Sequence, residues 1–503
     1  METFQHIMNG FLVCIQPINL WYTFIGVFLG TIIGVLPGIG PSAGIALLIP
    51  VTFGMNPTSA LIMMCGIYYG TKYGGSTTAI LIRTPGEAAS VMTSIDGYEM
   101  AKKGRAGAAL AVAAIGSFIA GTLGVVGLTI FAVPLSSMAL KFGPAEYFTL
   151  MLFAMTAVST LTGKSAAKGL LSTILGLMIA TIGIDLQSGQ ARFTMGVAEF
   201  QDGVGFVAVV VGLFAVAEVF RGLEDVYKGT GAKAMKIEGK LWLTREEWTR
   251  SIGPIWRGGV IGFIIGVLPG AGGTIASIMS YTTEKRLSKN PEEFGKGAIE
   301  GVAGPEAANN SDTAGAMVPL LTLGIPGGGA TAVLMGAFIM YGIQPGPLLF
   351  QNRPDLVWGL INSMYIGNVM LLILNLPLIG LFVRLLYIPS GILYPLIIAI
   401  SVIGAYAING SMTDLYLILL FGVIGYVFDK IDIPVAPLVL SLVLGGMMEQ
   451  SFRQAMTISG GSPKIFFSIG ITITLVVLSI ISVLTPFILP MIKKYKEDGT
   501  SDG

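Results

Sequence analysis

The chain has 503 residues, of which 53% are hydrophobic and only 11% charged, and its mean hydropathy is +0.79. Soluble globular proteins carry about 25% charged residues, so this composition excludes an ordinary water-soluble domain. The 29 Lys and Arg balance 28 Asp and Glu to a net charge of +1, which excludes the basic footprint of a nucleic-acid-binding protein.

Apolar runs of membrane-spanning length recur along the chain, for example at 106–133, 356–386 and 465–489. About 20 apolar residues cross the hydrocarbon core of a bilayer. Helices are favoured over a barrel, because the weak alternation of barrel strands is absent. We therefore predict an all-α polytopic membrane protein in a lipid bilayer. The N-terminal residues lack a basic region and a small-residue cleavage site, so we expect no removable signal peptide.

Residues that carry enzyme chemistry are scarce. Cys14 and Cys65 lie in apolar stretches without metal-ligand spacing, and His6 is the single histidine of the sequence. The sequence has no nucleophile motif, no paired-Asp signature and no phosphate-binding loop. We expect neither an enzyme nor an ATP-driven pump on this chain, and no cofactor.

The chain contains two Pro-Gly breaks, each of which occurs twice and in the same order. The run 30–40 returns at 262–272, and residues 32–38 are identical to 264–270. The run 81–90 is echoed at 322–331. Each break interrupts an apolar segment, because proline removes a backbone donor and glycine permits unusual dihedrals. The interrupted segments are 20–53, 76–93, 256–283 and 316–341.

Basic flanks suggest how these segments lie in the membrane. Arg250 and Arg257 precede the third segment, and Lys285, Arg286 and Lys289 follow it, so both its ends are predicted to be cytoplasmic. Arms of about twelve residues rise roughly 18 Å, about half a bilayer. We therefore predict a re-entrant hairpin with its glycine-rich tip near the midplane.

The second segment is also predicted to open to the cytoplasm, and the first and fourth to the periplasm. This reversed order predicts two inverted-topology repeats, each with two broken-helix hairpins, as in many secondary transporters. The predicted boundaries are 1–220 for the first membrane repeat, 221–255 for a cytoplasmic linker, 256–490 for the second repeat and 491–503 for a cytoplasmic tail.

Broken helices at membrane depth suit an organic anion, because helix N-termini offer N–H groups to a carboxylate. The glycines and prolines of the breaks would let a ligand approach the backbone, and nearby hydroxyls would bind it. The predicted substrate-binding residues are Gly38, Gly40, Ser42, Ser76, Thr77, Thr78, Arg83, Thr84, Pro85, Gly86, Gly270, Gly272, Gly273, Thr274, Pro326 and Gly327.

Five charged residues have more than one interpretation. Arg83 could bind a carboxylate bidentately, or extend to the interface or pair with Glu87. Glu87, Glu306 and Asp312 are either functional acids at membrane depth or solvated groups at a hairpin mouth. The aromatic neighbours of Lys72 favour an interfacial anchor over a substrate contact.

The polar run Asn309, Asn310, Ser311 and Asp312 has the oxygen donors of a hard-cation site. These four residues are the predicted sodium site, and helix capping is the alternative.

Several runs together resemble the large membrane subunit, TctA, of the tripartite tricarboxylate transporters. They are the runs 34–42, 69–78, 84–90 and 96–107, and 320–327 is similar to the second-half signature of that family. The resemblance covers essentially the whole chain.

The resemblance implies an elevator-type carrier with separate transport and scaffold domains in the bacterial inner membrane. Its implied partners are a small membrane subunit (TctB-type) and a periplasmic solute-binding protein (TctC-type). The implied substrates are citrate, other di- or tricarboxylates, or aromatic carboxylates, imported with a Na⁺ or H⁺ gradient. An organic-anion channel is the alternative, because the same half-helix dipoles could serve one.

Overall fold

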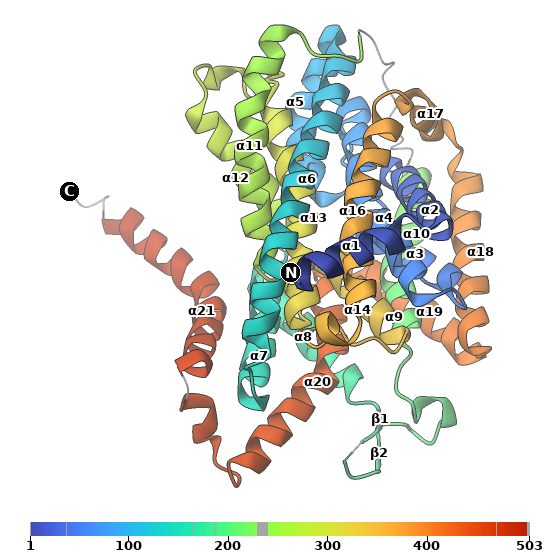
Figure 1. Cartoon of the computed structure of the whole chain (residues 1–503), viewed down its shortest axis with the longest axis vertical. Helices are drawn as coiled ribbons and strands as arrows, with labels where there is room; N and C mark the ends of the chain where they lie inside the picture. The colour runs from blue at the N-terminus through green and yellow to red at the C-terminus, as the bar shows by residue number, and fades with distance from the viewer. Residues whose placement is uncertain are drawn as a thin grey trace. The chain divides into compact units, whose positions relative to one another are not determined.

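The computed structural model describes residues 2–36, 38–163, 165–185, 187–228, 240–468 and 470–499. These ranges are almost entirely helical (Figure 1), which confirms the predicted all-α class. Residues 229–239 of the predicted linker, residues 500–503 of the predicted tail and Pro37 of the first break lie outside the described residues.

The chain packs into two compact units, the first formed by residues 1–137 and 207–426. Short π-helical turns at Ala101–Arg105 and Val211–Val216 join α5 to α6 and α9 to α10. Three helices of this unit, α6, α9 and α19, also include a few residues of the second unit. The helices of the first unit are α1 (Glu2–Cys14), α2 (Pro17–Val35), α3 (Pro41–Leu48), α4 (Pro57–Ile82), α5 (Val91–Met100), α6 (Ala106–Ala139), α9 (Phe206–Val210), α10 (Ala217–Lys228), α11 (Arg245–Val267), α12 (Gly272–Leu287), α13 (Glu300–Leu323), α14 (Gly329–Met340), α15 (Leu349–Asn352), α16 (Pro354–Asn375), α17 (Ile379–Val383), α18 (Ser390–Asn409) and α19 (Met412–Lys430).

The second unit comprises residues 138–206 and 427–503. It contains α7 (Pro144–Leu161), α8 (Ala166–Ala180), α20 (Ala436–Ile458), α21 (Gly470–Gly499) and an antiparallel pair of strands, β1 (Gly183–Ile184) and β2 (Ala191–Arg192). Each unit combines segments from both halves of the sequence. The repeat boundaries at 220 and 256 therefore stay predictions.

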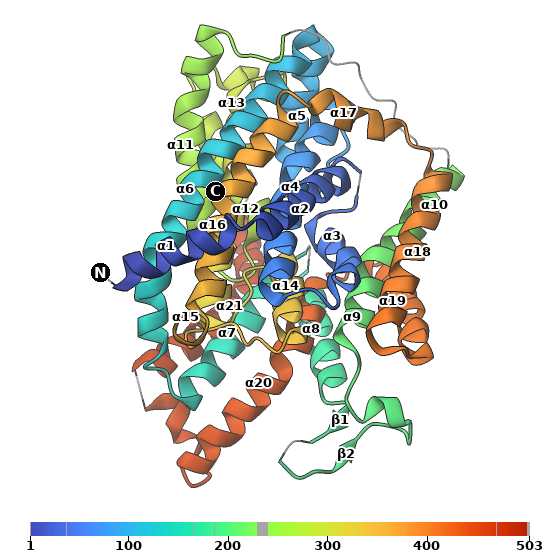
Figure 2. The same ribbon diagram turned by 45° about the vertical axis from the view of Figure 1, so that its right-hand side comes forward.

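Within the described ranges, six helical stretches are long and apolar enough to cross a membrane. They are Pro17–Val35, Ala88–Ala139, Phe206–Lys228, Pro354–Asn375, Gly391–Asn409 and Met412–Lys430. In the first unit α6 lies between α11 and α16, as Figures 1 and 2 both show. Ala120 of α6 lies beside Gly259, and Thr122 accepts a hydrogen bond from Asn368 at 3.0 Å. The protein is thus a multi-pass membrane protein.

Two helix pairs touch backbone to backbone through glycine. A β-carbon on Gly34 of α2 would lie 2.3 Å from the Thr71 carbonyl oxygen of α4. In the second half a β-carbon on Gly266 of α11 would lie 2.5 Å from the Asp312 carbonyl oxygen of α13. Small residues allow such close approach between membrane helices. Gly34 and Gly266 hold the same place in the repeated run, so the two pairs use one packing device.

The four predicted breaks all interrupt helices, and the two copies have matching backbone conformations. Gly38 and Gly270 have φ of 87° and 84°, and Arg83 and Gly324 have φ of 57° and 69°. Leu36 and Leu268, which end α2 and α11, have ψ of 119° and 120°. The similarity seen in the sequence therefore extends to the local geometry of the breaks.

The helices on the two sides of each break differ in length. The leading helices α2, α4, α11 and α13 have 19, 26, 23 and 24 residues, and the following helices α3, α5, α12 and α14 have 8, 10, 16 and 12. For the third segment, the expectation of about twelve residues on both sides of the break is wrong, because α11 has 23 residues and α12 has 16. The hairpin of α11 and α12 does close on itself, because Arg257 pairs with Glu284 at 2.5 Å.

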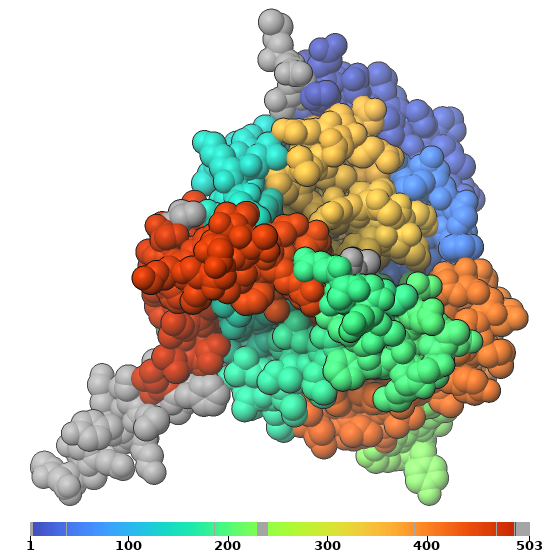
Figure 3. Space-filling model, turned by 90° about the horizontal axis from the view of Figure 1, so that it is seen from below, coloured from blue at the N-terminus to red at the C-terminus, as the bar shows by residue number. Residues whose placement is uncertain are grey.

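The two halves of the chain also meet at the end of α14. Tyr341, after α14, donates a hydrogen bond to the Thr52 carbonyl oxygen at 2.5 Å, and Thr52 ends the 3-10 turn Pro50–Thr52 that follows α3. Figure 3 shows this part of the second half in yellow against the N-terminal region in blue.

The helix packing yields a first prediction. Replacing Gly34 by Ala forces α2 and α4 apart, because the new methyl group meets a main-chain oxygen that cannot move alone. We expect the free energy of unfolding to fall by about 1–3 kcal/mol, the usual range for overpacking. Gly380→Ala is the control, since open space surrounds Gly380. Equal thermal unfolding midpoints for the two variants in detergent would contradict the packing argument.

A pH-dependent contact lies in the second unit, outside the membrane-spanning helices. The backbone N–H of Gln187 and the guanidinium of Arg453 bind the Asp185 carboxylate and lower its pKa to about 2. Because the carboxyl of an unfolded chain titrates near 4, this contact stabilises the fold above about pH 4 and is lost as pH falls toward 2. The thermal midpoints of wild type and Asp185→Asn should differ at pH 6 and converge as the pH falls to about 2. A difference that does not change with pH would contradict this assignment.

Candidate functional site

The two halves of the chain cross where α4 meets α13 in the middle of the first unit. Lys72 of α4 contacts Asn309 and Asp312 of α13, and Ser76, one turn further along α4, contacts Glu306, one turn earlier on α13. The two helices therefore run antiparallel. The break that follows α4 and the break that follows α13 therefore lie on opposite sides of the crossing.

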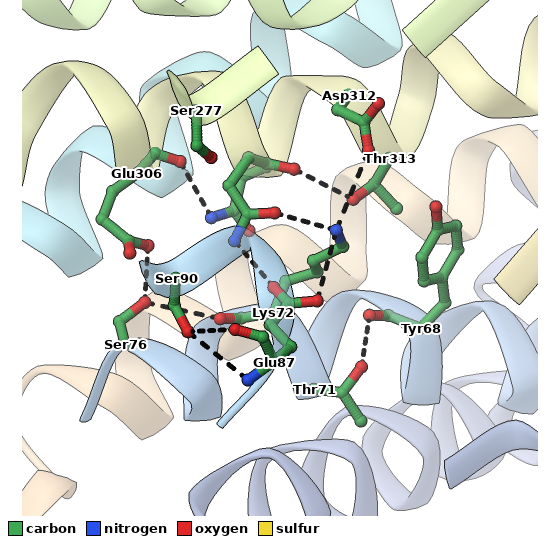
Figure 4. Close-up of polar contacts among 12 residues, drawn as sticks. Tyr68, Thr71, Lys72, Ser76, Glu87, Ser90, Ser277, Glu306, Asp312 and Thr313 are labelled. Carbon is green, nitrogen blue, oxygen red and sulfur yellow. Dashed lines mark hydrogen bonds and ion pairs between the residues drawn. The ribbon is translucent and has the colours of Figure 1, made fainter. Parts of the chain in front are cut away.

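A buried polar group, which we name the Lys72 cluster, consists of Lys72, Glu87, Asn309 and Asp312. The Lys72 Nζ donates to Asn309 Oδ1 at 2.8 Å and lies 3.4 Å from Glu87 Oε2 and 3.8 Å from Asp312 Oδ2. Asn309 Nδ2 in turn donates to Glu87 Oε1 at 2.7 Å. The charged side chains are 5%, 5% and 2% exposed. Figure 4 shows the lysine between the acids of the two halves.

Glu306 forms a second buried contact beside this cluster. Its carboxylate accepts hydrogen bonds from Ser76 Oγ at 2.5 Å and from Thr93 Oγ1. Among the described residues no lysine or arginine forms an ion pair with Glu306. Three carboxyl groups thus lie near one ammonium, and burial of unpaired charge costs several kcal/mol. The crossing therefore has more acidic groups than basic ones.

The breaks converge on the Lys72 cluster. Gly273, in the first turn of α12, is so close that a β-carbon on it would lie 2.8 Å from Lys72 Nζ and 3.0 Å from Asp312 Oδ2. A β-carbon on Gly40, which precedes α3, would lie 3.6 Å from the Glu87 β-carbon. The Gly270 N–H donates to the Gly327 carbonyl oxygen at 2.8 Å, so the two breaks of the second half also touch. The starts of α3 and α12 therefore lie beside the charged residues.

The predicted binding residues have different surroundings. Ser76, Thr77, Thr78, Gly86, Gly270, Gly273, Pro326 and Gly327 are buried, and Gly40, Ser42, Thr84, Pro85, Gly272 and Thr274 are half-buried. Gly38 and Arg83 are exposed. Arg83 ends α4 in the left-handed conformation and lies over the Tyr98 ring at 5.7 Å, apart from the Lys72 cluster.

The four residues of the predicted sodium site do not point to one place, because consecutive residues of α13 face different directions around the helix. Asn309 and Asp312 face Lys72. Asn310 Nδ2 donates to Ser117 Oγ of α6 at 2.6 Å, and Ser311 lies against Gly124 of α6.

Our interpretation of Lys72 as an interfacial anchor is wrong, because the residue is 4% exposed inside the first unit. The solvated alternative for Glu87, Glu306 and Asp312 is also wrong, since all three are buried. A signal for Lys72 was present in the sequence. It is the one charged residue in the 26-residue helix α4, and charge at membrane depth marks function by default.

Comparison with known proteins decides the family. The sequence model of the family described as "Tripartite tricarboxylate transporter TctA family" matches residues 20–440. The chain belongs to the TctA family. The match spans α2 to the start of α20, and so includes both copies of the breaks and the Lys72 cluster.

Two similar proteins come from Agrobacterium vitis. An uncharacterized 52.8 kDa protein in the TAR-I ttuC' 3'region is 48% identical to this chain over 497 residues, which cover 99% of this chain and 98% of that protein. An uncharacterized protein in the TAR-II ttuC' 3'region is 48% identical over 236 residues, or 47% of this chain and 97% of that protein. No solved structure matches this TctA-family chain.

The exposed position of Arg83 leads to a prediction. Arg83 has positive φ where the second half has Gly324, and this conformation costs a residue with a β-carbon about 1 kcal/mol or more. Arg83→Gly should raise the free energy of unfolding by up to about 1 kcal/mol and leave the uptake rate within about twofold of wild type. The measurements are thermal unfolding and initial uptake rates, with Lys102→Gly as the control. A loss of uptake with unchanged stability would instead assign Arg83 to substrate binding.

Proposed function

We propose that this chain is the permease subunit of a binding-protein-dependent secondary transporter that imports small carboxylates across the bacterial inner membrane. The family implies a transporter and not an enzyme. The substrates proposed are citrate, other di- or tricarboxylates, or aromatic carboxylates, and an ion gradient drives their accumulation. The partners proposed are a TctB-type membrane subunit and a TctC-type periplasmic binding protein.

The observation that carries this proposal is the convergence of the broken helices on buried charge. The starts of α3 and α12 lie beside the Lys72 cluster, and backbone N–H groups at a helix start bind carboxylates. The half-buried residues Ser42 and Thr274 add hydroxyls in the first turns of these helices. We propose that the substrate carboxylates bind at these two starts, next to Lys72.

The matching breaks of the two halves support an inverted repeat, and we propose that the segment pairs α2–α5 and α11–α14 form the moving transport domain of an elevator. In such carriers the substrate site lies near the midplane between repeats. The antiparallel crossing of α4 and α13 is the arrangement that this proposal requires.

Uptake by cells that make this chain with both partner subunits tests the function. Labelled citrate, four-carbon dicarboxylates and an aromatic carboxylate would be offered with and without the binding protein. We expect saturable uptake that depends on the binding protein and an ion gradient. Uptake that rises linearly with substrate and needs no binding protein would favour an organic-anion channel. No uptake of any carboxylate would contradict the proposed substrate class.

A pair of glycine variants tests the site. Gly273→Ala places a methyl group against Lys72, Asn309 and Asp312, whereas Gly328→Ala at the start of α14 meets nothing within 4 Å. We expect Gly273→Ala to lower the uptake rate at least tenfold at wild-type membrane abundance, and Gly328→Ala to lower it less than twofold. Equal rates in both variants would show that transport does not depend on the geometry around the cluster.

A further inference from the structure

The Lys72 cluster has the donors of a cation site. Its oxygens come from separate parts of the first unit: Glu87 from the break after α4, and Asn309 and Asp312 from α13. Carboxylate and amide oxygens are the ligands that hard cations prefer. These oxygens converge on one nitrogen, the Lys72 Nζ, which lies 2.8 Å from Asn309 Oδ1, 3.4 Å from Glu87 Oε2 and 3.8 Å from Asp312 Oδ2. The position that a metal cation would take is held by a side chain of the protein.

The residues present do not fit a sodium ion beside this lysine. Lys72, Glu87 and Asp312 are buried, and the α12 backbone covers them so closely that even a β-carbon on Gly273 would lie 2.8 Å from both Lys72 Nζ and Asn309 Oδ1. The remaining members of the predicted sodium site, Asn310 and Ser311, face α6. Of the predicted sodium site, only Asn309 and Asp312 belong to the cluster, and both already contact the Lys72 ammonium.

One oxygen of the cluster is left over. Asp312 Oδ1 is buried and has no hydrogen-bond partner among the described residues, although the Asp312 side chain is only 2% exposed. A buried acceptor without a partner costs free energy. A metal cation in place of the ammonium could take this oxygen as well, because it needs several oxygen ligands, whereas an ammonium has three donors.

We propose that the Lys72 ammonium is a built-in cation which closes this site to sodium, and that removal of the ammonium opens the site to a sodium ion. The ligands of that ion would be Glu87, Asn309 and Asp312. The consequence for transport, which rests on the proposed function, is that wild-type uptake needs no sodium at this site. The binding statement does not depend on transport.

Thermal unfolding of the purified chain tests the binding statement directly. The proteins compared are wild type, Lys72→Ala, Asp312→Asn, the double variant Lys72→Ala with Asp312→Asn, and the exposed-lysine control Lys102→Ala. Each would be measured in choline chloride and in sodium chloride at equal ionic strength. We expect the midpoint of Lys72→Ala to rise saturably with sodium, since a ligand that binds the native state stabilises it. Wild type and Lys102→Ala should show no sodium response, and the double variant should lose it.

Each other outcome has a defined meaning. If Lys72→Ala is recovered folded only in sodium, the proposal is supported; if it is recovered in neither salt, or folds without a sodium response, the proposal is wrong. A sodium response of wild type that Asp312→Asn removes would also overturn it. Uptake by wild type in choline medium, with sodium dependence appearing in Lys72→Ala, would extend the result to transport. No uptake by wild type in either medium would count against the proposed function alone.

Discussion

The structure of the first unit depends on the direct backbone contact of α2 with α4 and of α11 with α13. Glycines spaced four residues apart, Gly30 and Gly34 in one pair and Gly262 and Gly266 in the other, let the partner helix lie against the main chain. In a bilayer, dispersion contacts and hydrogen bonds hold helices together, because lipid is as apolar as the side chains. These two closely packed pairs fix where the breaks lie, and so where α3 and α12 start.

The crossing of α4 and α13 adds polar contacts to the apolar packing of these helix pairs. Residues 237 positions apart, Lys72 and Asn309, are joined by a buried hydrogen bond, and the acids Glu87 and Asp312 share the same ammonium. Truncating one partner of such a buried group leaves the others uncompensated, at about 3–5 kcal/mol. The crossing therefore ties the two halves together while it places charge beside the helix starts. The proposed transport of a carboxylate depends on both properties.

Local features of this fold follow from the sequence, whereas contacts between the halves do not. Adjacent proline and glycine residues mark the four breaks, so the repeated runs around Gly38 and Gly270 predicted the interruptions and their similarity. The early starts of α4 and α13, which the predicted segments 76–93 and 316–341 leave out, were missed. Polar residues such as Lys72 in α4 and Asn309 in α13 hide the helical continuity of a buried segment. The burial of Lys72 and its pairing with Asp312 arise only when the two halves cross, and no local pattern encodes that distance. The resemblance to the TctA family named the partners and substrates, which the residues alone did not.

The central claim is that a carboxylate binds where broken helices begin beside the Lys72 cluster. An experimental structure of this chain with its partner subunits and a transported carboxylate tests it most directly. The account predicts a carboxylate group within hydrogen-bond distance of backbone N–H groups in Gly40–Ser42 or Gly272–Thr274, next to Lys72. A carboxylate bound away from both helix starts, for example in the apolar groove that Val126 of α6 and Phe263 of α11 line, would contradict it.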